Sequence, residues 1–121
     1  MKNKLDDSKP IFLQIKEYIE DSIISGALSE GEKVPSTNEF AAYYKINPAT
    51  AAKGINELVA EDILFKRRGV GMFVAENAKD LLVTKHKTNF YEEYIKPLKQ
   101  AAEKLDISKS ELMNMLKRED S

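Results

Sequence analysis

The chain has 121 residues and a net charge of −1; 42% of its residues are hydrophobic and 32% are charged. This length suits one compact domain with a short appendage, and no stretch approaches the roughly 20 apolar residues that a membrane-spanning helix needs. Cysteine is absent, which excludes disulfides and thiol catalysis. The polar N-terminus is unlike a secretory signal, so we expect a cytoplasmic protein with no membrane partner.

The first helix is expected from about residue 8 to residue 25. Gly26 suits the left-handed position that follows a helix end. Residues 27–35 contain Gly31 and Pro35 and are predicted to form a loop. The apolar side chains of the helix recur at the spacing of one helix face, which predicts that they lie in the core; they are Phe12, Ile15, Ile19 and Ile23.

Two helices joined by a very short turn are expected next. Ser36 and Glu39 fit a capping box at the start of a short helix. After a turn at residues 45–46, Asn47 and Pro48 suit the N-cap and the first position of a third helix. The predicted buried stripe of this third helix consists of Ala51, Ile55, Leu58 and Val59.

A β-hairpin is expected after the third helix, because the apolar-rich runs 63–66 and 72–75 flank a connector, 67–71, that holds two glycines. The order helix, helix, tight turn, helix, hairpin predicts a winged helix-turn-helix. The predicted fold class is therefore mostly α with a small β-hairpin. We expect a DNA-binding domain over residues 1–77 and a helical dimerisation domain over residues 78–121.

The C-terminal segment is expected to form a long helix over residues 78–105. Pro97 falls inside it and should kink or divide it. Ser108 and Glu111 fit a second capping box before a last short helix. Apolar side chains at three- and four-residue spacing predict a helix–helix seam and a homodimer; the predicted dimerisation residues are Tyr91, Tyr94, Leu98, Ala101, Leu105, Leu112, Met113 and Leu116.

Double-stranded DNA is the predicted partner of the N-terminal segment. A helix N-terminus can dock on phosphate, a third helix of this kind fits the major groove, and an arginine-tipped hairpin can enter the minor groove. Residues 1–77 carry 10 basic and 12 acidic side chains, so a DNA-binding surface must concentrate its positive charge locally. The predicted DNA-binding residues are Ser36, Thr37, Asn38, Asn47, Ala49, Thr50, Lys53, Arg67, Arg68, Gly69 and Gly71.

Several short motifs resemble the GntR family of bacterial regulators, in the family's order and spacing. They are Pro-Ile-Phe-Leu-Gln-Ile from position 10, Gly-Glu-Lys-Val-Pro-Ser-Thr from 31, Ile-Asn-Pro-Ala-Thr from 46 and Arg-Arg-Gly-Val-Gly-Met-Phe-Val from 67. The Asn-Pro-x-Thr variant and the short tail resemble the YtrA-type subfamily. The resemblance implies a homodimeric regulator, often a repressor, with its dimer interface in the tail, and an inverted-repeat operator mirrors such a dimer. Operons for ABC-type transporters are frequent targets in that subfamily.

The chain departs from the family pattern by carrying fewer cations. Asn38 stands where the family commonly has arginine, Lys45 stands where glycine is usual in the turn, and Lys53 is the only cation of the third helix. A winged helix that binds protein instead of DNA therefore stays open as an alternative. A hydrolase or transferase is disfavoured, since we find no catalytic set, no metal site and no cofactor motif. Whether a small-molecule effector binds is unknown from the sequence.

Overall fold

The computed structural model describes residue 5 and residues 7–119. The chain divides into two compact units, Met1–Val83 and Thr84–Ser121, and each is described here by itself. The division falls six residues beyond the predicted boundary at residue 77, inside the helix that begins at Ala78. That the two units are a DNA-binding and a dimerisation domain stays a prediction.

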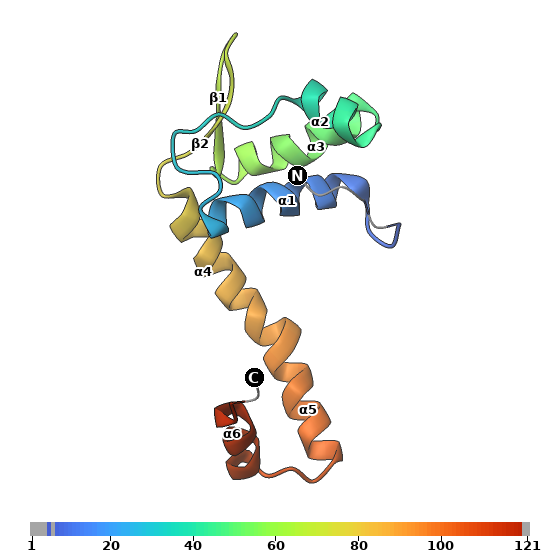
Figure 1. Cartoon of the computed structure of the whole chain (residues 1–121), viewed down its shortest axis with the longest axis vertical. Helices are drawn as coiled ribbons and strands as arrows, with labels where there is room; N and C mark the ends of the chain where they lie inside the picture. The colour runs from blue at the N-terminus through green and yellow to red at the C-terminus, as the bar shows by residue number, and fades with distance from the viewer. Residues whose placement is uncertain (1–4, 6, 120–121) are drawn as a thin grey trace. The chain divides into compact units, whose positions relative to one another are not determined.

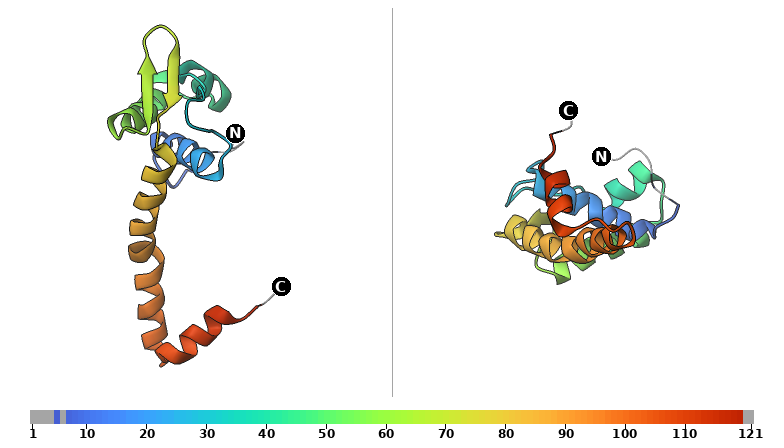
Figure 2. Two further views of the ribbon diagram at one scale, coloured as in Figure 1. Left: turned by 90° about the vertical axis from the view of Figure 1, so that its left-hand side faces the viewer. Right: turned by 90° about the horizontal axis from the view of Figure 1, so that it is seen from below.

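The first unit contains three helices, a two-stranded antiparallel hairpin and the start of a fourth helix (Figure 1). The hairpin stands out from the helices as a wing (Figure 2). This arrangement confirms the predicted fold class, mostly α with a small β-hairpin. The elements are α1 (Ile11–Ser25), α2 (Thr37–Tyr44), α3 (Pro48–Ala60), β1 (Leu64–Arg67), β2 (Gly71–Val74) and α4 (Ala78–Phe90).

The core of the first unit joins all of these elements. The predicted stripes of α1 and α3 are buried, apart from Phe12 and Val59, which are half-buried. Full burial of an isoleucine or leucine side chain stabilises a fold by roughly 1.5–3 kcal/mol, so this cluster is the main source of stability here. Its members are Ile15, Ile19, Ile23, Val34, Phe40, Ala51, Ile55, Leu58, Ile63, Leu64, Val74, Ala78 and Leu82.

The second unit is helical throughout its regular part. It takes the end of α4, a π-helical turn η1 (Tyr91–Ile95), α5 (Lys96–Lys104) and α6 (Lys109–Lys117). Helix α6 folds back at an angle from α5 (Figures 1 and 2). The Ser108 hydroxyl accepts from the Glu111 N–H over 3.1 Å, which is the Ser108 half of the predicted capping box.

The predicted long helix is divided just before Pro97, where the π-helical turn η1 separates α4 from α5, and the chain stays helical through the proline itself. Proline has no N–H to donate, and its ring crowds the preceding turn of a helix. The wider π-helical turn just before Pro97 accommodates the missing hydrogen bond and the ring. The Lys96 N–H donates to the Tyr91 carbonyl, five residues back, as in a π-bulge. None of the helices in the described part of the chain has the length and apolar character that a membrane crossing requires.

Candidate DNA-binding surface

Helix α2 begins with the capping box that the sequence predicts. The Ser36 hydroxyl accepts from the Glu39 N–H over 3.0 Å, and the Glu39 carboxylate accepts from the Ser36 N–H over 3.1 Å. The pKa of the Glu39 carboxyl lies below its ordinary value. The main cause is the hydrogen bond with the Ser36 backbone, followed by the hydrogen bond with the Ser36 side chain, and the positive charge of Lys33 lowers the pKa further. Ser36, Thr37 and Asn38 therefore lie where the first N–H groups of α2 meet solvent.

The turn between α2 and α3 spans only residues 45–47. Lys45 has a left-handed conformation with φ 57°. Glycine, which the family usually has at this position, adopts this conformation readily. Asn47 caps α3, since its side-chain oxygen accepts from the Ala49 N–H over 2.8 Å, and Pro48 occupies the first helical position. Ala49 and Thr50 lie in the first turn of α3, at the end predicted to meet DNA.

The predicted wing is present, with its cations at the tip. Arg67 ends β1 and pairs with Gly71, which begins β2. Arg68, Gly69 and Val70 form the turn between them, with Gly69 at φ 78°. The Val70 N–H donates to the Arg67 carbonyl over 2.9 Å. All of these residues except Gly71 are exposed, and Gly71 is half-buried.

The Arg67 guanidinium lies on aromatic rings of the wing. Its central carbon is 5.1 Å from the ring centre of Phe73 and 5.9 Å from that of Phe65, and the two rings stack on each other at 5.7 Å. A guanidinium over aromatic faces gains cation–π attraction, so the wing restricts the direction in which Arg67 points. No sequence pattern pointed to these phenylalanines as the support of Arg67.

A third extended segment, absent from the predictions, lies along β2. The sequence predicts a loop over residues 27–35, but residues 31–34 within it are extended. The Val34 N–H donates to the Met72 carbonyl and the Val74 N–H donates to the Glu32 carbonyl, each over 2.9 Å, and Lys33 forms a bridge with Phe73. The wing is therefore braced on its second edge, with β2 in the middle.

Lys53 lies one turn further along α3, and its side chain contacts α1. Its ammonium nitrogen is 3.9 Å from the ring centre of Phe12. Lys53 is nevertheless exposed, so its side chain is accessible for the predicted contact with DNA. The helical pattern identified Phe12 as a core residue and gave no signal for this contact.

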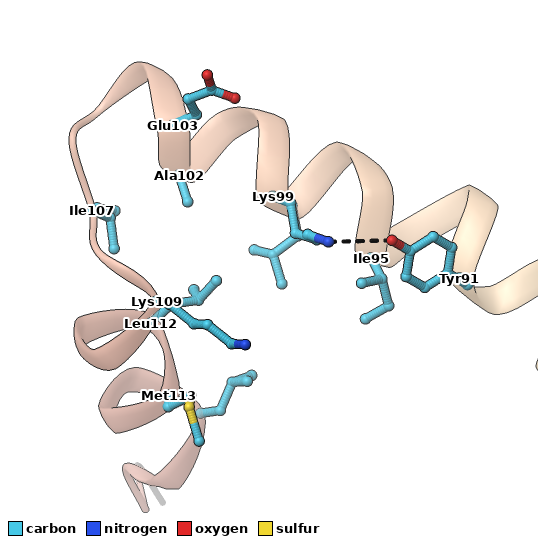
Figure 3. A pocket seen from close by; sticks show the side chains of 11 residues that line it. Tyr91, Ile95, Lys99, Ala102, Glu103, Ile107, Lys109, Leu112 and Met113 are labelled. Carbon is cyan, nitrogen blue, oxygen red and sulfur yellow. Dashed lines mark hydrogen bonds between the residues drawn. The ribbon is translucent and has the colours of Figure 1, made fainter.

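The second unit carries a groove of about 500 Å³ between η1–α5 and α6 (Figure 3). Five of the predicted dimerisation residues line it: Tyr91, Leu98, Leu112, Met113 and Leu116. The other three, Tyr94, Ala101 and Leu105, lie outside it and are exposed.

The phase of the helical spacing explains why the predicted seam is divided. Tyr94 and Ala101 lie three residues after Tyr91 and Leu98, whereas the positions that share the groove with Tyr91 and Leu98 lie four residues after them. The positions that face the groove are Tyr91, Ile95, Leu98 and Ala102. The predicted dimerisation residues do not include Ile95 and Ala102, which lie seven residues apart on this face.

No cluster of three metal-ligating side chains occurs among residues 7–119.

Residues 12–74 match the family described as "Bacterial regulatory proteins, gntR family". The chain is 34% identical to the HTH-type transcriptional regulator YhcF of Bacillus subtilis over 119 residues, covering 97% of this chain and 95% of that protein. It is 38% identical to the repressor YtrA of the same organism over 76 residues, or 63% of this chain and 58% of YtrA.

Solved structures agree with these relatives. A GntR family transcriptional regulator from Listeria monocytogenes has a TM-score of 0.79 and 30% identity, with 96% of this chain and 100% of that chain covered. The DNA-binding domain of AraR in complex with its operator ORX1 has a TM-score of 0.54 and 30% identity over 62% of this chain and 92% of that one. YtrA and YhcF support the YtrA-type subfamily, and the relatives are regulators rather than enzymes. The chain belongs to the GntR family and is a DNA-binding transcriptional regulator with a winged helix-turn-helix domain.

Proposed function

We propose that this regulator binds an inverted-repeat operator as a homodimer and represses transcription from it. The observation that carries the proposal is the amount of apolar surface exposed on the second unit. The exposed fractions are 58% for Tyr94, 71% for Leu105 and 71% for Leu116. Scattered apolar residues are ordinary on a protein surface, but a contiguous apolar groove with exposed neighbours is typical of an interaction site.

A second copy of the chain is the occupant that we propose for this surface. One winged helix reads few base pairs, and its cations are sparse here, so sequence specificity benefits from two copies on one duplex. A two-fold protein dimer is matched by a two-fold symmetric operator. The predicted dimerisation residues inside and outside the groove would then become buried together.

Repression is proposed on the basis of the relatives. YtrA is named a transcriptional repressor, and the arabinose metabolism regulator of Geobacillus stearothermophilus, 34% identical over 92 residues, is also named a repressor. A dimer bound across a promoter would exclude polymerase from it, and this mode of repression requires no further domain in the regulator.

The proposal is tested by selecting preferred duplexes from a random pool and examining their symmetry. We expect two half-sites in inverted orientation, with centres separated by about one helical turn or a multiple of it. Sedimentation of the full-length chain at tens of micromolar should give twice the 13.7 kDa mass of one chain. Selected duplexes with a single asymmetric site, together with a monomeric protein, would contradict the dimer. A reporter whose expression rises with the regulator would contradict repression.

A further inference from the structure

The outer face of the wing brings together residues from three segments. Side chains alternate between the two faces of a sheet, and residues paired across strands share a face. Because Arg67 pairs with Gly71, and both Phe65 and Lys33 pair with Phe73, these five residues lie on one face. The opposite face carries the buried Leu64 and Val74 of the core, so the face with Arg67 and Lys33 is the outer one.

Gly71 gives the Lys33 side chain its place on this face. A Cβ at position 71 would lie 2.7 Å from the Lys33 Cε, and Gly71 has φ 144°. The stem of Lys33 therefore passes over the bare backbone of Gly71, while Arg67 lies on the strand beyond it. Two like charges on one face, with a glycine between them, repel each other; that arrangement is favoured when an anion binds there.

Lys33 also lies near the start of α2. Its positive charge is one of the causes of the lowered pKa of Glu39, which belongs to the first turn of that helix. Lys33 is exposed. Lys33 is thus a cation that lies between the wing and the N-terminus of α2. Both of these parts of the fold are predicted to contact DNA.

We propose that Lys33 is a DNA-contacting residue, and that its ammonium binds a backbone phosphate between the wing and the start of α2. A lysine ammonium is a compact point charge that suits a single phosphate. The contact is independent of base sequence and supplies a cation near the first turn of α2, the turn in which Asn38 stands where the family commonly has arginine. In this assignment Gly71 acts through Lys33: it leaves room for the lysine stem.

The test removes the charge and keeps the stem. Lys33→Met retains an unbranched apolar chain over Gly71. Affinity is measured for a random-sequence duplex over a series of salt concentrations, because phosphate contacts dominate non-specific binding. We expect the slope of log affinity against log salt to fall in magnitude by about 0.9, with an unchanged melting temperature of the free protein. Lys33→Arg, which keeps the charge, should keep the slope.

The matched control is Lys79→Met, which removes one exposed lysine from the start of α4, in the same unit but beyond the end of β2 opposite the tip. It should leave the slope unchanged. A Lys33→Met protein with wild-type slope and affinity would overturn the assignment. So would an equal fall in slope for Lys79→Met, which would indicate only overall charge. An equal loss in Lys33→Arg would indicate a packing role and would also overturn it.

Discussion

Lys53 illustrates how a single side chain can belong to two contacts. In the free protein its ammonium lies 3.9 Å from the Phe12 ring centre, a cation–π contact worth about 0.5–1 kcal/mol at an exposed site. In the predicted contact with a base edge, the side chain would leave that ring. Phe12 would then compete with DNA for Lys53, the only cation of α3.

Replacing Lys53 with alanine should relax base preference at one position in each half-site, at a cost of about 1–3 kcal/mol on the preferred duplex. Phe12→Leu should have the opposite sign, because it removes the competing ring; we expect about two- to fivefold tighter binding, the factor that corresponds to about 0.5–1 kcal/mol. Both are measured by titration on selected and scrambled duplexes. Equal losses on every sequence for Lys53→Ala would identify a phosphate contact instead of a base contact.

At the scale of elements, the packing of α1 on α3 depends on one glycine. A Cβ at Gly54 would lie 2.5 Å from the backbone oxygen of Phe12, and backbone cannot rotate away as a side chain can. Gly54 therefore permits the close packing of α1 on α3.

Gly54→Ala should therefore destabilise the protein, although alanine favours a helix by about 1 kcal/mol over glycine. Overpacking costs typically about 1–3 kcal/mol, and here the helices must separate to relieve it. We expect a lower urea midpoint with an unchanged slope. Asn56→Ala, at an exposed position of the same helix, is the control and should leave the midpoint almost unchanged. A Gly54→Ala protein as stable as wild type would contradict the close contact.

An ion pair also joins these helices. The Lys16 ammonium donates to Glu57 over 3.4 Å and to Glu61. Burial alone lowers the pKa of Lys16, but the hydrogen bond and charge of Glu61, with Glu57 and Glu20, outweigh it and raise the pKa. A raised lysine pKa means that the stabilisation is complete below the ordinary lysine range and is lost as pH rises through the folded-state value. The pair is thus intact at neutral pH.

Local patterns accounted for most of the elements of the first unit, and the failures in that unit are non-local. The caps at Ser36 and Asn47 depend on residues two or three positions away, so the sequence alone predicted them. The pairing of residues 31–34 with β2 depends on a segment about 40 residues further along the chain, and Gly31 and Pro35 pointed to a loop instead. The Lys53–Phe12 contact likewise depends on how two helices pack.

At the scale of the whole molecule, the end of the first unit matters for any dissection of the chain. Ala78 and Leu82 are fully buried in its core, although the predicted domain boundary lies before them. Separating the units at residue 77 would therefore expose apolar surface that the core normally covers.

A chain ending at Val83 should accordingly fold, while a chain ending at Asn77 should be much less stable. Loss of a buried leucine side chain alone costs about 2–5 kcal/mol, and the shorter fragment loses a buried alanine as well. Circular dichroism during thermal unfolding compares the two fragments. Equal melting temperatures would contradict a contribution of α4 to the core and would support the boundary predicted from the sequence.

The assembly itself is tested by placing charge on the exposed apolar surface of the second unit. Leu105 and Leu116 are each 71% exposed in the single chain, so replacing both with glutamate should barely affect the fold of one chain. In a dimer that covers them, however, two buried carboxylates without partners would be strongly unfavourable. We expect the double variant to sediment as a monomer at concentrations where the wild type is a dimer. The double variant should lose most of its affinity for an inverted repeat and keep its affinity for a single half-site.

The control is Leu81→Glu, at an exposed leucine of the first unit, which should stay dimeric. A double variant that remains dimeric would exclude this surface as the interface, and the specificity of the regulator would then need another source.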